Sequence, residues 1–120
     1  MDAAVEEALK QDRTIDITTR GRVSGQPRRK EIWFHNLDGR LYITGTPGPR
    51  DWYKNMVANP EFTFHLKGST KADLTARATP VVDPSRRREI LAAIISKVGR
   101  GWDVDAWVEG SVLVEVVLDG

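Results

Sequence analysis

The stretch IWFHNLDGRLYI, residues 32–43, decides the fold. Side chains alternate along its first half, so that Ile32 and Phe34 share one face of a strand and the residues between them share the other. Asp38-Gly39 follows, and an Asp-Gly pair between two apolar runs is among the strongest short-range signals for a β-hairpin. The stretch therefore predicts two antiparallel strands, residues 30–37 and the return strand 41–43.

Further apolar runs on both sides of this hairpin predict the rest of a sheet. Residues 61–67 alternate cleanly, with the aromatic side chains expected inward. Residues 112–118 are apolar on both faces, which is typical of a central strand. Because hairpins dominate, we expect a largely antiparallel sheet, and closure into a small barrel would remove its edges. The fold class predicted is mainly β (α+β), with about six strands: residues 15–18, 30–37, 41–43, 61–67, 72–82 and 112–118.

One long helix and two short ones are predicted. Asp83 is the expected N-cap of the long helix, Pro84 takes its first position and Gly99 ends it. Residues 102–107, which contain two tryptophans, are expected to form a loop leading to the last strand. The predicted helices are residues 2–12, 50–59 and 85–98.

Composition bounds the class of protein. A chain of 120 residues is expected to form a single domain, residues 1–120. A net charge of +1 argues against nucleic-acid binding, and the absence of cysteine excludes disulfides and thiolate chemistry. No apolar run approaches the roughly 18 residues of a membrane span, and the first residues do not resemble a signal peptide. We therefore expect a cytoplasmic protein.

Three features have ordinary interpretations. His35 and His65 are expected to be surface or interface residues, and without a cluster of other ligands no metal site is expected. The run from Arg86 to Arg88 stands at a helix start, the unfavourable end for cations, and is expected to be a solvated face.

The stretch from Thr19 to Lys30 is the main candidate for a binding site. It holds five basic residues and no acidic one, interspersed with glycine, proline and serine. Such a composition predicts a loop whose N–H groups, hydroxyl and guanidinium groups bind an anion. A solvated charged turn is the competing interpretation.

A second candidate stretch is WYKNM, residues 52–56. Trp52 and Met56 are four residues apart and fit a helix face that packs on the core. Asn55 lies among apolar neighbours, so packing explains it less well. Its carboxamide is expected to contact a polar ring edge or to cap a neighbouring loop.

These two stretches together resemble the deazaflavin-dependent nitroreductase family, small split β-barrel proteins related to the pyridoxamine-phosphate oxidase group. The shared pattern is Thr-x-Gly-Arg-x-Ser-Gly-x-x-Arg, then a hairpin, then Trp-Tyr-x-Asn-Met-x-Ala-Asn-Pro. The likeness covers about half of the chain, from Ile17 to Ala76. The matching residues are Thr19, Gly21, Arg22, Ser24, Gly25, Gln26, Pro27 and Arg28, then Trp52, Tyr53, Asn55, Met56, Ala58, Asn59 and Pro60.

The resemblance implies a split barrel that binds the deazaflavin coenzyme F-420 and passes a hydride to a small quinone, nitroaromatic or enone-like acceptor. It implies that the basic loop holds the phosphate and glutamyl tail of the cofactor, and that the helix and the segment after the hairpin lie beside it. It also implies a homodimer, which is common in the wider superfamily. The implied cofactor-binding residues are Arg22, Ser24, Gly25, Arg28, Lys30, Thr44, Thr46, Trp52 and Asn55.

Departures from the family pattern leave two alternatives open. Val23 stands where the family commonly has lysine, which tilts slightly towards FMN, whose single phosphate needs fewer cations. Family nitroreductases place tyrosines in the last third of the chain, whereas the last one here is Tyr53. No catalytic residue or proton donor is therefore assigned, and Trp102 and Trp107 are expected to line the pocket as apolar walls. The alternatives are an FMN-binding oxidoreductase of the same fold and a non-catalytic module that binds a cofactor or other ligand.

Overall fold

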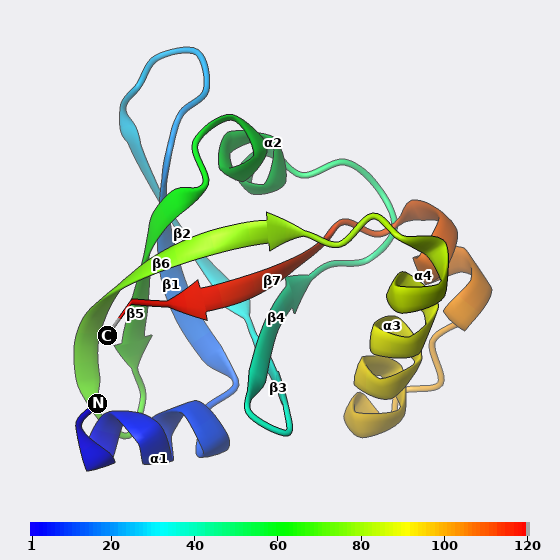
Figure 1. Cartoon of the computed structure of the whole chain (residues 1–120), viewed down its shortest axis with the longest axis horizontal. Helices are drawn as coiled ribbons and strands as arrows, with labels where there is room; N and C mark the ends of the chain where they lie inside the picture. The colour runs from blue at the N-terminus through cyan, green and yellow to red at the C-terminus, as the bar shows by residue number, and fades with distance from the viewer. Residues whose placement is uncertain (120) are drawn as a thin grey trace.

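One antiparallel sheet organises the chain in a computed structural model that describes residues 1–119 (Figure 1). Its seven strands in this range lie in the order β2-β1-β5-β6-β7-β4-β3, and every neighbouring pair is antiparallel. The predicted antiparallel sheet is confirmed, as is the inner position of the last strand. The strands are β1 (Thr14–Arg20), β2 (Pro27–Trp33), β3 (His35–Leu37), β4 (Arg40–Thr44), β5 (Glu61–Lys67), β6 (Lys71–Pro80) and β7 (Leu113–Leu118).

The two edges of the sheet are consecutive pieces of chain, β2 and β3, separated only by Phe34. β2 pairs with β1 and β3 pairs with β4, so the chain leaves one edge at this residue and joins the other. The N–H of Phe34 donates to Arg13 O at 2.9 Å instead of to a sheet partner. The sheet therefore curls into a split barrel. The prediction of a single strand over residues 30–37 is wrong, because the chain forms β2 and β3 there, and this division gives seven strands where six were expected.

The predicted hairpin turn is confirmed. Asp38 and Gly39 both have positive φ, 53° and 91°, and join β3 to β4. A tight turn of this kind needs two left-handed residues, a conformation that Asp tolerates and Gly adopts freely.

Four helices accompany the sheet in residues 1–119: α1 (Ala3–Gln11), α2 (Asp51–Ala58), α3 (Pro84–Val98) and α4 (Val104–Gly110). The long helix has the expected ends, since the Asp83 side chain accepts from the N–H of Arg86 and Gly99 is left-handed with φ 75°. Helix α4 lies where a loop was expected. Asp103 caps it by accepting from two backbone N–H groups of its first turn, the end that a helix leaves unpaired.

Two apolar cores result. The first fills the barrel, where Phe34 and Phe64 pack edge to face with their ring centres 5.2 Å apart. The second lies between α3, α4 and the sheet, where the rings of Trp102 and Trp107 stack with centres 4.5 Å apart. In Figure 1, α3 and α4 lie together at one side of the sheet.

Both histidines are buried, which contradicts the expectation of surface positions. His65 is 7% exposed, with Nε2 2.7 Å from Thr18 Oγ1 and Nδ1 2.7 Å from Asp73 Oδ1. His35 is 8% exposed, and burial, aided by the charges of Arg13 and Lys97, lowers its pKa from 6.5 to about 4. The burial of each histidine depends on partners and packing from other elements, so the alternation along a single strand could not predict it.

The arginine run at the start of α3 is a solvated face only at Arg88, since Arg86 and Arg87 are half-buried. Arg86 pairs with Glu115, and Arg88 with Asp105 at 2.8 Å. Arg87 donates to the carbonyls of Val81, Val108 and Ser111 at 2.7–3.1 Å. The run therefore joins α3 to α4 and β7, because the C-terminal carbonyls of α4 lie within reach of it.

In the part of the chain that the structure describes, no three His, Asp or Glu side chains lie where they could share a metal ion. None of its helices combines the length and the hydropathy needed to cross a bilayer.

Candidate functional site

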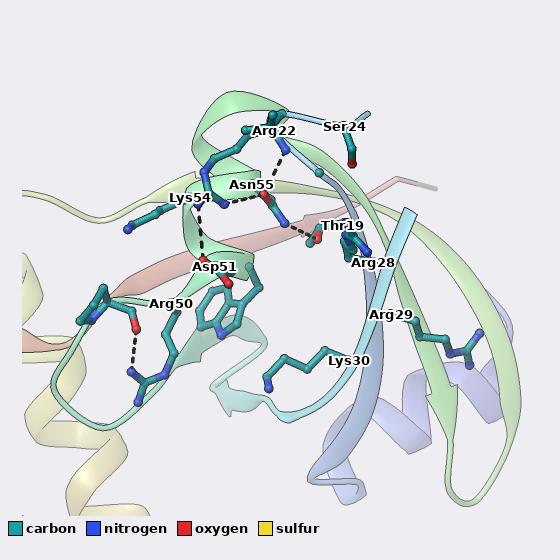
Figure 2. Close-up of a pocket in the computed structure, with 14 residues that line it drawn as sticks. Thr19, Arg22, Ser24, Arg28, Arg29, Lys30, Arg50, Asp51, Lys54 and Asn55 are labelled. Carbon is teal, nitrogen blue, oxygen red and sulfur yellow. Dashed lines mark hydrogen bonds and ion pairs between the residues drawn. The ribbon is translucent and has the colours of Figure 1, made fainter. Parts of the chain in front are cut away.

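A cleft of about 870 Å³ lies between the β1–β2 hairpin and helix α2 (Figure 2). We call it the basic cleft, because six of its residues are basic and one, Asp51, is acidic. The residues that line it are Thr19, Gly21, Arg22, Val23, Ser24, Arg28, Arg29, Lys30, Pro49, Arg50, Asp51, Trp52, Lys54 and Asn55.

The irregular part of the basic stretch is only residues 21–26, which we call the tip loop. It is closed by the N–H of Gly21 donating to Gln26 O at 2.8 Å and that of Gly25 donating to Gly21 O at 2.9 Å. A Cβ at residue 21 would lie 2.8 Å from Ser24 Oγ and 3.3 Å from Gln26 O, so the Ser24 hydroxyl would have to move. The loop predicted over residues 19–30 was too long, because β1 continues to Arg20 and β2 begins at Pro27.

Strand β2 distributes its cations over two faces. Arg28 and Lys30 share one face and Arg29 takes the other, as period-two alternation requires. The Arg29 guanidinium donates to Asp16 at 2.9 Å, and Figure 2 shows it turned away from Lys30. Hydrogen bonds from Lys67 and Arg29 lower the pKa of Asp16, so the charge of Arg29 is largely matched there.

Asn55 joins the tip loop to helix α2. It is 4% exposed, and its Oδ1 accepts from both the backbone N–H and the Nη1 of Arg22, at 3.1 and 3.0 Å. Its Nδ2 donates to Thr19 Oγ1 at 3.3 Å. The second Nη of Arg22 is 3.4 Å from Asp51 Oδ1, and Figure 2 shows these contacts as one chain of bonds.

The opposite wall, residues 45–50, is organised by Arg50. Its guanidinium donates to the carbonyls of Thr46 and Pro49 and to Thr46 Oγ1, at 2.6–2.9 Å. It also packs against Gly45, where a Cβ would lie 3.3 Å from Arg50 Nε. The glycine therefore leaves room for the side chain that holds this wall.

The remaining cations have no such role. Among residues 1–119, no hydrogen bond or ion pair engages the side chains of Arg28, Lys30 or Lys54. Three unmatched positive groups around one cleft favour a ligand with several negative charges, because Asp51, the one acidic residue of its lining, is already paired with Arg22.

The structure brings most of the expected cofactor-binding residues together. Three of them do not line the cleft: Gly25 lies in the tip loop with φ 72°, Thr44 is buried with its hydroxyl donating to Val112 O at 2.5 Å, and Thr46 binds Arg50. Trp102 and Trp107 lie in the second core and do not line the cleft, which contradicts their expected place in the pocket. The expected residues on its surface are Arg22, Ser24, Arg28, Lys30, Trp52 and Asn55.

Sequence reasoning missed Arg50 and Lys54. They are four residues apart in the sequence, Arg50 as the extended N-cap residue of α2 and Lys54 within the helix, and both line the cleft. That spacing was a usable signal, which the apolar Trp52–Met56 pattern obscured.

Comparisons with known proteins agree with the fold and point to one family. The model of the F-420H(2)-dependent quinone reductase family matches residues 1–119. Among solved structures, a conserved hypothetical protein from Mycobacterium tuberculosis is similar, with a TM-score of 0.75, 19% identity and coverage of 100% of this chain and 82% of that one. An F-420 reductase is also similar, with a TM-score of 0.69, 18% identity and coverage of 100% of this chain and 96% of that one. A FAD-binding protein from Mesorhizobium loti has a TM-score of 0.68 and 18% identity, and the match covers 100% of this chain and 91% of that one.

Identities this low establish the fold alone, whereas the family model covers the whole described chain. The unmatched cations of the basic cleft also suit a cofactor with an anionic tail. The chain is therefore an enzyme that belongs to the F-420H(2)-dependent quinone reductase family, and its cofactor is the deazaflavin coenzyme F-420.

Proposed function

We propose that this protein transfers a hydride from reduced F-420 to a small quinone, nitroaromatic or enone-like acceptor, with the cofactor tail in the basic cleft. The carrying observation is the group of unmatched cations Arg28, Lys30 and Lys54 around a cleft of about 870 Å³, in a chain of this family. An F-420 reductase among its structural neighbours is consistent with the proposal.

The chain's own residues would bind and orient the cofactor. Arg28, Lys30 and Lys54 would neutralise the phosphate and carboxylates of the tail, while Ser24 and the N–H groups of the tip loop, Gly25 included, would orient its oxygens. Trp52 is 5% exposed and lines the cleft, so it would form an apolar floor towards the ring. When bound, F-420 supplies the hydride chemistry, and the protein supplies position and exclusion of water.

We further propose that residues 1–120 act as one domain, in the cytoplasm and as a homodimer. The single domain is supported by the sheet, in which β7 from the end of the chain pairs with β4 and β6. Light scattering after size-exclusion chromatography tests the dimer, and a monomer mass at working concentration would overturn it.

The test of the cofactor is a fluorescence titration of the purified protein with F-420 and, separately, with FMN. We expect saturable binding of F-420 and much weaker binding of FMN, because one phosphate engages fewer of the cations. Saturable binding of FMN alone would instead favour the alternative oxidoreductase.

The test of the reaction follows the absorbance of reduced F-420 in the presence of a simple naphthoquinone, a nitrobenzene and a cyclohexenone. We expect protein-dependent oxidation with at least one of these acceptors. Tight binding without oxidation across the panel would refute the proposed reaction and favour a non-catalytic binding module.

A further inference from the structure

The carboxamide of Asn55 spends most of its hydrogen-bonding capacity inside the protein. Its oxygen already accepts from the backbone N–H and the Nη1 of Arg22, and its nitrogen donates to Thr19 Oγ1. The side chain is 4% exposed, and Thr19 beneath it is 2% exposed. A contact between a cofactor ring and the Asn55 oxygen would therefore have to replace a bond that is already made inside the protein, and the side chain is too deeply buried to present more than the second Nδ2 hydrogen.

These bonds join the tip loop to helix α2, which it also contacts through the longer pair of Arg22 and Asp51 at 3.4 Å. The tip loop is largely exposed, with Val23 at 93%, and its internal bonds connect only its own residues. Through Arg22, the Asn55 oxygen ties this loop to helix α2, while the bond to Thr19 fixes the carboxamide against β1. An exposed loop without such a tie would sample many conformations, and ordering it on binding would weaken affinity.

On the opposite wall of the cleft, an arginine also joins a loop to helix α2, but here the arginine lies at the helix end and its partner lies in the loop. There a loop residue, Thr46, accepts from a helix-end arginine, Arg50, at 2.8 and 2.6 Å. The cleft thus has two arginines whose hydrogen bonds serve its walls, and three cations whose side chains bind nothing within residues 1–119: Arg28, Lys30 and Lys54.

We infer that Asn55 is a positioning residue, which holds Arg22 and the tip loop in place for the anionic tail of the cofactor and makes no contact with the cofactor itself. The inference rests on the proposed placement of that tail. It assigns the direct recognition of charge to Arg28, Lys30 and Lys54.

The first test needs no cofactor. Limited trypsin digestion of the ligand-free protein reports the mobility of the tip loop through cleavage after Arg22. We expect Asn55→Ala to accelerate this cleavage about tenfold, whereas Asn55→Asp restores the wild-type rate because a carboxylate still accepts from Arg22 and the Thr19 hydroxyl can donate to it. Val57→Ala, an exposed change on the same helix, is the matched control and should leave the rate unchanged.

Equal cleavage of wild type and Asn55→Ala would overturn the inference. If Asn55→Ala lowers the melting temperature so far that global unfolding dominates cleavage, Thr19→Val replaces it, because this nearly isosteric change removes only the anchor of the carboxamide. Unchanged cleavage after Arg22 in that variant would likewise overturn it.

The second test is a double-mutant cycle on the Kd for F-420, with Arg22→Ala, Asn55→Ala and both together. If Asn55 acts through Arg22, Asn55→Ala raises the Kd about tenfold in the wild-type background. In the Arg22→Ala background the same substitution raises the Kd by about threefold or less. The same factor in both backgrounds would show that Asn55 does not act through the Arg22 side chain and would refute that part of the positioning role. Absence of F-420 binding to the wild type would refute the proposed function while leaving the proteolysis result intact.

Discussion

Acid should destabilise this protein through His35 before its carboxylates protonate. Burial, with Arg13 and Lys97 nearby, lowers the pKa of His35 from 6.5 to about 4. Between these two values the unfolded chain binds a proton that the folded chain does not, so stability falls as the pH falls through this window. Each pKa unit is worth about 1.4 kcal/mol, so the full loss is about 3 kcal/mol, complete below about pH 4.

The window separates this effect from those of the ion-paired carboxylates. Lys67 and Arg29 lower the pKa of Asp16, and the hydrogen bond with His65 lowers that of Asp73. The stability from such carboxylates is present above their unfolded pKa of 3.8 and is lost only as the pH falls below it. Measurements above about pH 4 therefore report mainly on histidine.

The assay is urea denaturation, followed by tryptophan fluorescence, at pH 7.5 and about pH 4.5 for the wild type and His35→Leu. We expect the wild type to lose about 2.5 kcal/mol between the two, and the variant to lose that much less, because leucine cannot accept the proton. Subtracting the variant cancels contributions from other groups. Equal losses in the two proteins, or an NMR titration of His35 with a midpoint near its ordinary value, would refute the reasoning.

Three further predictions concern the cleft and the fold. Arg28→Ala combined with Lys30→Ala should raise the Kd for F-420 about a hundredfold in a fluorescence titration, because charged hydrogen bonds are worth about 1.5–3 kcal/mol each. Lys71→Ala removes a cation outside the basic cleft and should leave the Kd unchanged. A change below about threefold in the double variant would contradict the role of these cations. Asp83→Ala should lower the free energy of unfolding by about 1 kcal/mol in urea, because it removes the N-cap of α3, and no loss would contradict the cap. Phe64→Ala should cost about 3–5 kcal/mol in the same assay, because the ring is 0% exposed, and a loss below about 1 kcal/mol would show that the barrel core is loosely packed.

Local signals in the sequence were sufficient for the elements that depend on neighbours along the chain. The Asp38-Gly39 turn and the Asp83-to-Gly99 helix follow from backbone preferences of single residues, and the structure has both. Strand β5 also has its expected bounds, Glu61–Lys67, because its alternation continues without interruption between two turns. Helix α4 carried a usable signal in Asp103, but seven residues are too few for periodicity to distinguish a helix from a loop.

What the sequence could not predict depends on contacts between distant segments. Residues 30–37 alternate as one strand, yet the chain changes partners at Phe34, and only the closure of the sheet determines where. The basic cleft was predicted in outline, because its cations are concentrated in one stretch. The pairing of Arg22 with Asn55, 33 residues away, separates the cations bound by the protein from those that remain unmatched, and no local pattern contains it.

Closure of the sheet by consecutive strands has an evolutionary consequence. One residue inserted beside Phe34 would leave the register of β3 against β4 unchanged, because the Asp38-Gly39 turn fixes it, but it would displace Phe34, which is buried between the two edges of the sheet. The tip loop carries no such penalty, because it joins two strands beyond their last pairing, Arg20 with Pro27. Descendants of this chain are therefore free to vary in length beside the cleft, where they meet their ligands, while the length of the β2–β3 passage stays constant.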